Sequence, residues 1–112
     1  MAEPERLICA AADLRSGEDG RRFELADGQA AFAVRWQGKV FGWLNQCRHV
    51  PLELDWNPGR FFDDSGLYLI CATHGALYAP DTGLCVSGPC SGRALFPITL
   101  VERDGNVYLV ET

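Results

Sequence analysis

Turn-forming residues interrupt this chain at short intervals, and no other feature constrains its fold as strongly. The 112 residues include 12 Gly and 6 Pro, which end regular structure or supply the backbone geometry of tight turns. Between the turns lie short runs rich in Val, Ile, Phe, Tyr and Trp, the residues that favour strands. The expected strands are 6–9, 22–26, 30–36, 39–44, 60–62, 67–70, 77–78, 84–86, 96–102 and 107–110. This pattern predicts an all-β protein of antiparallel hairpins.

Two turns predict hairpins directly. Gln37-Gly38 joins the runs 30–36 and 39–44, and Asp104-Gly105-Asn106 joins 96–102 and 107–110. Evidence for helix is weak, because the segment 9–15 has room for one helical turn before the next glycines end it. No repeat or linker divides the sequence, and its length is that of one domain. We therefore expect a single domain over residues 1–112.

Charge and hydropathy exclude several classes of protein. Lys and Arg number 10 against 15 Asp and Glu, which gives a net charge of −5 and argues against nucleic acid as the partner. No run of apolar residues approaches the 18 or so that a membrane-spanning helix needs. The first residues lack the basic and apolar regions of a secretory signal. We expect a cytoplasmic protein whose five Cys stay reduced and serve a metal site or pack as thiols.

The Cys and His residues form two clusters. One is Cys47-Arg48-His49 and the other is Cys71-Ala72-Thr73-His74-Gly75, so both His of the chain stand beside a Cys. A Cys₂His₂ set binds zinc, although zinc sites usually place two Cys first and two His later. The interleaved order here also suits a two-iron cluster, in which two thiolates hold one iron and two imidazoles hold the other. Both chemistries are open on the residues alone.

These motifs, together with Ser87-Gly88-Pro89 further along, resemble the Rieske [2Fe–2S] family and its small ferredoxin-like members. The resemblance implies a Rieske fold of antiparallel sheets, with a small cluster-binding subdomain formed by two loops at about 45–59 and 71–92. It also implies the ligands and the proline loop that covers the cluster. The ligands would be Cys47, His49, Cys71 and His74, and the covering loop would contain Gly88 and Pro89.

The resemblance extends to residues that set the reduction potential. Ala76 stands where high-potential respiratory members carry a Ser donor, whereas Tyr78 matches their Tyr and is expected to donate a hydrogen bond to a cluster ligand. Thr73 stands at one position of their interloop disulfide, so that disulfide cannot form. These differences predict a potential below that of the respiratory type. The longer gap between the two motifs predicts an extended loop and hairpin.

The remaining cysteines and aromatic residues have plainer interpretations. Cys9 is expected to be a buried thiol, and Cys85 and Cys90 are expected to pack as thiols rather than form a disulfide or a redox pair. Trp36 and Trp43 are expected in the core or on a sheet face. For Trp56, loop residue and partner contact are equally open, and Asp63-Asp64 is expected to be a solvated turn.

The function that follows is a soluble one-electron carrier without a catalytic site of its own. We expect a ferredoxin that passes electrons from a flavoprotein reductase to an oxygenase or another terminal enzyme. The length leaves no room for a mononuclear iron site, and no small-molecule substrate is identified. Three alternatives stay open: the small Rieske subunit of an assimilatory nitrite reductase, a redox-sensing or regulatory module, and a zinc-bound structural domain.

Overall fold

The protein is all-β, as the spacing of its turns predicts. The computed structural model describes residues 5–48, 52–55, 57–73 and 75–110. Its elements, in chain order, are β1 (Glu5–Ala10), the 3₁₀ turn η1 (Ala11–Asp13), β2 (Arg21–Glu24), β3 (Ala30–Trp36), β4 (Lys39–Leu44), β5 (Leu69–Ile70), β6 (Leu77–Tyr78), β7 (Cys85–Ser87), β8 (Pro97–Ile98), β9 (Leu100–Arg103) and β10 (Asn106–Val110). Within these ranges, no helix is long and apolar enough to cross a bilayer.

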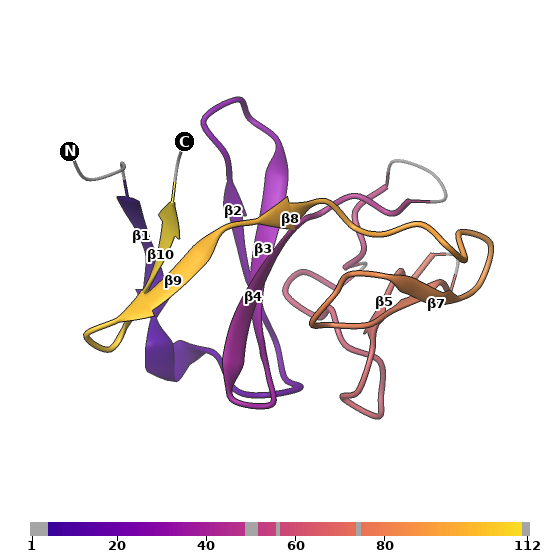
Figure 1. The fold of residues 1–112 in the computed structure, drawn as a ribbon, viewed down its shortest axis with the longest axis horizontal. Helices are drawn as coiled ribbons and strands as arrows, with labels where there is room; N and C mark the ends of the chain where they lie inside the picture. Colours follow the sequence, from indigo (N-terminus) through magenta and orange to yellow (C-terminus); the bar gives the residue numbers. More distant parts are fainter. Residues whose placement is uncertain (1–4, 49–51, 56, 74, 111–112) are drawn as a thin grey trace.

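The strands form three antiparallel sheets arranged along a molecule of 42 × 28 × 23 Å. The strand orders are β1-β10-β9, β2-β3-β4-β8 and β5-β6-β7. Strands β1, β9 and β10 lie at one end of the long axis, β5 and β7 lie at the other, and β2, β3, β4 and β8 lie between (Figure 1). The third sheet thus lies at one end of the domain, with the central sheet beside it.

Both predicted hairpins are confirmed. Gln37 and Gly38 have φ values of 49° and 81°, and Asp104 and Gly105 have φ values of 53° and 78°. Two consecutive positive φ values are the signature of a type I′ turn, whose twist matches that of the strands it joins. The second turn needs only two residues, because Asn106 already pairs with Arg103 in the β9–β10 ladder.

The predicted strand 96–102 is two strands, because it serves two sheets. Strand β8 pairs with β4 through Pro97 and Ile98, whereas β9 pairs with β10. The chain changes sheets at Thr99, whose carbonyl accepts a hydrogen bond from the N–H of Val110 in β10 and so continues the β9–β10 pairing by one residue. Proline fits here because β8 is an edge strand, where a missing N–H leaves no ladder bond unmade.

The predicted strand 60–62 is wrong as a full strand. Only Phe62 forms an isolated bridge, to Leu69. Backbone bonds of 2.9 Å from Asp63 N–H to the Tyr68 carbonyl and of 2.8 Å from Ile70 N–H to the Phe61 carbonyl complete an irregular hairpin. The extended loop and hairpin expected between the motifs is therefore present in its described part. The predicted helical turn is the single 3₁₀ turn η1.

The main core lies between the central sheet and the small third sheet. Phe32 of β3 stacks on Phe61 of the long intermotif segment, with ring centroids 3.9 Å apart and planes 11° from parallel. Trp43 is buried in the same cluster and Trp36 packs against it, as predicted. Burial of Phe61 and its neighbours shows that the long segment is part of the core. A smaller cluster around Cys9 packs the β1–β10 end, which confirms Cys9 as a buried thiol.

Candidate cluster site

Two loops of matching form bring one cysteine each to the same end of the molecule. Cys47 follows β4 and Cys71 directly follows β5, and their exposed fractions are 2% and 0%. The Cys47 N–H donates to the Leu52 carbonyl at 2.8 Å, and the Cys71 N–H donates to the Ala76 carbonyl at 2.9 Å. Each cysteine therefore begins a loop that is closed five residues later by its own backbone N–H.

The predicted imidazole ligands belong to these same two loops in sequence. His49 lies between Cys47 and Leu52, and His74 lies between Cys71 and Ala76, but both His are outside the described residues. Among the residues that are described, no three His, Cys, Asp or Glu side chains gather in a way that could hold a metal. The four-ligand set therefore stays a prediction, supported by the two buried thiols and by the loops that contain the histidines.

A buried polar network fixes the first loop to the second. The Asn45 side chain accepts a 2.8 Å bond from the Leu54 N–H and donates a 2.9 Å bond to Asp55. Asp55 also accepts a 2.8 Å bond from the Gly59 N–H. The Leu54 carbonyl then accepts a 3.0 Å bond from the Ala72 N–H, one residue after Cys71. Satisfied polar groups of this kind make a buried segment rigid and specific.

The sequence reasoning missed Asn45 and Asp55. A signal was present, because Asn45 is the first polar residue after the apolar run of β4 and stands two residues before Cys47. An Asn at the end of a buried strand needs hydrogen-bond partners. Its partner ten residues later was not evident from composition or periodicity, since Asp55 lies in a segment without regular structure.

Tyr78 lies at the centre of the site, as the resemblance implies. Its hydroxyl oxygen is 3.4 Å from the Cys47 sulfur and accepts a 3.0 Å hydrogen bond from the Arg48 N–H. It is also 3.1 Å from the sulfur of Cys90, a contact that the sequence did not predict. Burial, and then the hydrogen bonds to Cys47 and Cys90, raise the pKa of this hydroxyl. Tyr78 therefore stays protonated and keeps one hydrogen to donate.

The proline loop packs against the end of the second cysteine loop. Gly88 has a φ of +105°, and a Cβ at this position would lie 2.9 Å from the Cα of Ala76. Glycine is thus required both by the backbone conformation and by the close approach. The neighbouring Pro89 is exposed. The loop therefore lies against the second cysteine loop, whereas the role of Gly88 and Pro89 in covering a cluster stays a prediction.

Two arginines, Arg48 within the first cysteine loop and Arg93 in contact with it, place positive charge near this loop. The Arg48 guanidinium lies 4.2 Å from the centroid of the Phe96 ring and donates a 3.0 Å bond to the Ala94 carbonyl. Arg93 donates a 3.2 Å bond to the Arg48 carbonyl. Their positive charges favour any group near Cys47 that gains negative charge on reduction. Neither arginine stood out in the sequence, because Arg48 occupies the variable position between two predicted ligands and Arg93 lies in a segment with no motif.

The residues present fit an iron–sulfur cluster. Thiols are deprotonated when they bind metal, and a buried thiolate needs a cation or hydrogen-bond donors nearby. Cys47 has the Tyr78 hydroxyl and the arginines close by, and the Asn45–Asp55 network fixes its loop to that of Cys71. Thiolates from two loops with an imidazole residue in each are the donor types of a Rieske centre.

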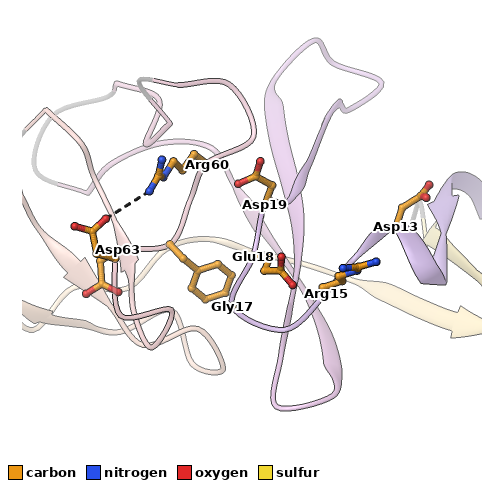
Figure 2. Close-up of a pocket in the computed structure, with 9 residues that line it drawn as sticks. Asp13, Arg15, Gly17, Glu18, Asp19, Arg60 and Asp63 are labelled. Carbon is orange, nitrogen blue, oxygen red and sulfur yellow. Dashed lines mark hydrogen bonds and ion pairs between the residues drawn. The ribbon is translucent and has the colours of Figure 1, made fainter.

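The hollow shown in Figure 2 is a different place on the molecule. It has a volume of about 470 Å³ and lies between the segment after η1 and the turn at residues 60–64. Its charged residues include Asp13, Glu18, Asp19, Arg60 and Asp63, and neither of the predicted ligands that the structure describes, Cys47 and Cys71, lines it. Asp64 lies at its edge with a fully exposed side chain 3.5 Å from Arg60, as expected for a solvated turn. We assign no chemistry to this hollow.

Comparison with known proteins identifies the family and the fold. A sequence profile of the Rieske [2Fe–2S] domain matches residues 5–108. No curated protein sequence matches the chain. Among solved structures, a chain in the complex of reduced oxygenase and oxidised ferredoxin of carbazole 1,9a-dioxygenase is similar, with a TM-score of 0.78, 23% identity and coverage of 97% of this chain and 94% of that chain.

Two ferredoxins have the same fold. The Sphingomonas yanoikuyae B1 ferredoxin gives a TM-score of 0.78 at 20% identity, covering 97% of this chain and 100% of its own. The ferredoxin of carbazole 1,9a-dioxygenase from Nocardioides aromaticivorans IC177 gives 0.76 at 20% identity, covering 96% and 98%. At these identities the similarity shows the fold, and the predicted arrangement of antiparallel sheets with a small subdomain of loops is confirmed.

Proposed function

Because the chain belongs to the Rieske [2Fe–2S] family, we propose that it is a one-electron carrier whose cluster is held by Cys47, His49, Cys71 and His74. The family match indicates a Rieske-type [2Fe–2S] cluster. The observation that carries the ligand assignment is the pair of matching loops, each begun by a buried cysteine and each containing one histidine in sequence. When bound, the cluster supplies a single reversible electron transfer.

The protein's own residues adjust how readily that electron is accepted. Tyr78 holds its hydroxyl hydrogen beside the Cys47 sulfur, where a hydrogen bond favours the more negative, reduced state. Arg48 and Arg93 add positive charge on the same side. The Asn45–Asp55 network holds the loops in one arrangement, so little structural change accompanies a change of charge.

The terminal partner that we favour is an oxygenase. Structurally similar chains include ferredoxins of carbazole 1,9a-dioxygenase, one of them described in complex with its oxygenase, and they support a partner of that class. Exposed apolar side chains occur on the segments near the loops, namely Leu52, Val86 and Phe96. Exposed apolar side chains, with the Arg48 guanidinium over the Phe96 ring, suit transient docking, and the net charge of −5 makes the encounter sensitive to salt.

The test begins with the purified protein and its cysteine variants. We expect iron and sulfide in place of zinc, and a Rieske-type paramagnetic signal on reduction. Cys47→Ser and Cys71→Ser should lose this signal, whereas Cys9→Ser should keep it, because Cys9 is equally a buried cysteine but lies in the core cluster at the other end. Zinc in the purified protein, or loss of the signal in Cys9→Ser alone, would contradict the assignment.

The carrier role is tested by reconstitution. A flavoprotein reductase, this protein and a ring-hydroxylating oxygenase are mixed, and product formation is followed with and without this protein. Strict dependence on this protein, decreasing as salt is added, supports the carrier. Rapid reduction by the reductase without reoxidation by the oxygenase would instead favour a sensor or a different terminal enzyme.

A further inference from the structure

Cys85 and Cys90 form a close pair of thiols that the proposed carrier role does not use. Their sulfurs are 2.8 Å apart, and the two residues are 3% and 2% exposed. Backbone bonds from Cys85 N–H to the Arg93 carbonyl at 2.7 Å, and from Arg93 N–H to the Cys90 carbonyl at 2.9 Å, hold the loop in this form. A disulfide needs sulfurs about 2.05 Å apart, so bonding requires an approach of less than ~1 Å.

The pair is connected to the predicted ligand Cys47 through one hydroxyl group. The Tyr78 oxygen lies 3.1 Å from the Cys90 sulfur and 3.4 Å from the Cys47 sulfur. A hydroxyl has only one hydrogen to donate, and in Tyr78 the two sulfurs compete for it. The contact with Cys90 is the shorter of the two, so in the thiol form of the pair Cys90 shares this hydrogen with Cys47 and weakens the bond to Cys47.

We propose that Cys85 and Cys90 are a reversible dithiol–disulfide pair, and that its oxidation directs the Tyr78 hydroxyl hydrogen to the Cys47 sulfur. A disulfide sulfur has no hydrogen and accepts hydrogen bonds more weakly than a thiol or thiolate, so the competition for the Tyr78 hydrogen ends. The electrostatic consequence at Cys47 rests on the proposed function, since it needs Cys47 to hold the cluster. The formation of the disulfide does not.

The oxidant that fits is a small-molecule disulfide of the glutathione class. One thiolate of the pair attacks this disulfide, forms a mixed disulfide and releases one glutathione thiolate, which takes up a proton. The second cysteine then attacks the protein sulfur of the mixed disulfide, the Cys85–Cys90 bond forms, and the second glutathione leaves as a thiol. Two electrons pass from the protein sulfurs to the glutathione sulfurs, and the two thiol protons pass to the two glutathiones.

The environment of Cys85 makes this exchange slow at neutral pH. Burial, followed by the hydrogen bond with Cys90, raises the pKa of the Cys85 thiol to about 11. Only the thiolate attacks a disulfide, so few molecules react at any moment. The segment above the pair is exposed, however, including Val86, Gly88 and Ser91. Small movements of this exposed loop would admit the oxidant.

The experiment uses the protein with its cluster, equilibrated without oxygen in glutathione buffers of rising disulfide content. Samples are denatured in acid and alkylated. A fully reduced chain takes five labels for its five Cys, and the oxidised pair leaves two fewer, with Cys85 and Cys90 linked in the peptide map. Cys85→Ser and Cys90→Ser should abolish this change, and Cys9→Ser should not. An unchanged label count at high disulfide would overturn the pair.

The second readout is the reduction potential of the cluster. Oxidation of the pair should shift the cluster's reduction equilibrium toward the reduced state by about threefold to tenfold, which is about 30 to 60 mV for a one-electron couple. In Tyr78→Phe the disulfide should still form while this shift disappears. A disulfide that forms without changing the potential of the unaltered protein would overturn the coupling. Failure of Cys47→Ser to lose the cluster would instead count against the proposed function.

Discussion

Gly83 of the third sheet's β6–β7 turn packs against Trp43 of the central sheet. Its replacement by alanine tests how tightly the two sheets are packed. It lies in the turn between β6 and β7 with a φ of +72°. A Cβ there would lie 2.7, 2.9 and 3.1 Å from three carbons of the Trp43 ring. The ring has no room to retreat, because Trp43 is buried and its indole N–H donates a 3.1 Å bond to the Pro80 carbonyl.

The expected cost has two parts. A non-glycine residue in the left-handed region costs about 1–2 kcal/mol, and overpacking a core costs about 1–3 kcal/mol. Gly83→Ala should therefore lower the free energy of unfolding by about 2–5 kcal/mol. Gly105→Ala is a matched control, because Gly105 has a φ of +78° and no atom within 4 Å of the added Cβ. It should cost only the backbone part, about 1–2 kcal/mol.

Urea unfolding followed by tryptophan fluorescence measures both variants. The free energies of unfolding of the two variants should differ by the steric contribution, about 1–3 kcal/mol. Gly83→Ala should also lose cluster absorbance faster at a fixed temperature, because Cys71 directly follows β5 of the third sheet. Equal destabilisation by the two substitutions would refute the packing argument. Trp43→Phe in the Gly83→Ala background should recover part of the loss, because the contacted carbons belong to the six-membered ring of the indole.

Three further outcomes can be measured with single variants. Tyr78→Phe removes the hydroxyl beside Cys47. If the hydrogen bond from Tyr78 to the Cys47 sulfur strengthens by about 1 kcal/mol on reduction, its loss should lower the reduction potential by about 40 mV. An unchanged potential in a redox titration would contradict this role. Asp55→Ala leaves buried donors unpaired and should cost about 2–4 kcal/mol in urea unfolding, against about 0.5 kcal/mol or less for the exposed Asp64→Ala. In the folded protein the pKa of the Cys85 thiol is raised from 9.0 to about 11, so folding favours the protonated thiol. The free energy of unfolding should therefore be highest below pH 9 and fall as the pH rises to 11. Cys85→Ala should make that fall shallower, and a urea midpoint that does not change with pH would contradict the prediction.

Local features of this fold were predictable and distant pairings were not. Strands β3 and β4 match their predicted bounds because turn residues with positive φ, Gln37 and Gly38, mark where the hairpin reverses. The pairing of β1 with β10 joins opposite ends of the sequence, and no local pattern encodes it. The run 96–102 looked continuous because periodicity does not reveal that Thr99 is where the chain passes from one sheet to another.

In the candidate site, too, local features were predictable and contacts between distant segments were not. Cysteine and histidine spacing left zinc and a two-iron cluster open, and the resemblance to the Rieske family favoured the cluster. The sequence also placed the predicted ligands in two loops. The Asn45–Asp55 network was missed because it depends on two irregular segments meeting in space. The contact between Tyr78 and Cys90 was missed for a related reason. Cys90 lies in an irregular loop, and only the three-dimensional course of that loop brings its sulfur to the hydroxyl.

The position of β1 and β10 has a consequence for engineering. Both strands lie at the end of the long axis opposite the third sheet (Figure 1), and the molecule is 42 Å long. A partner enzyme fused beyond either strand would not cover the cluster loops, but its linker would have to reach around the domain. For a flexible glycine-rich linker, a root-mean-square span of 42 Å needs about 60 residues, whereas an extended proline-rich spacer needs only about 14. A short fusion should therefore transfer electrons between neighbouring molecules in preference to within one, and its turnover should depend on protein concentration.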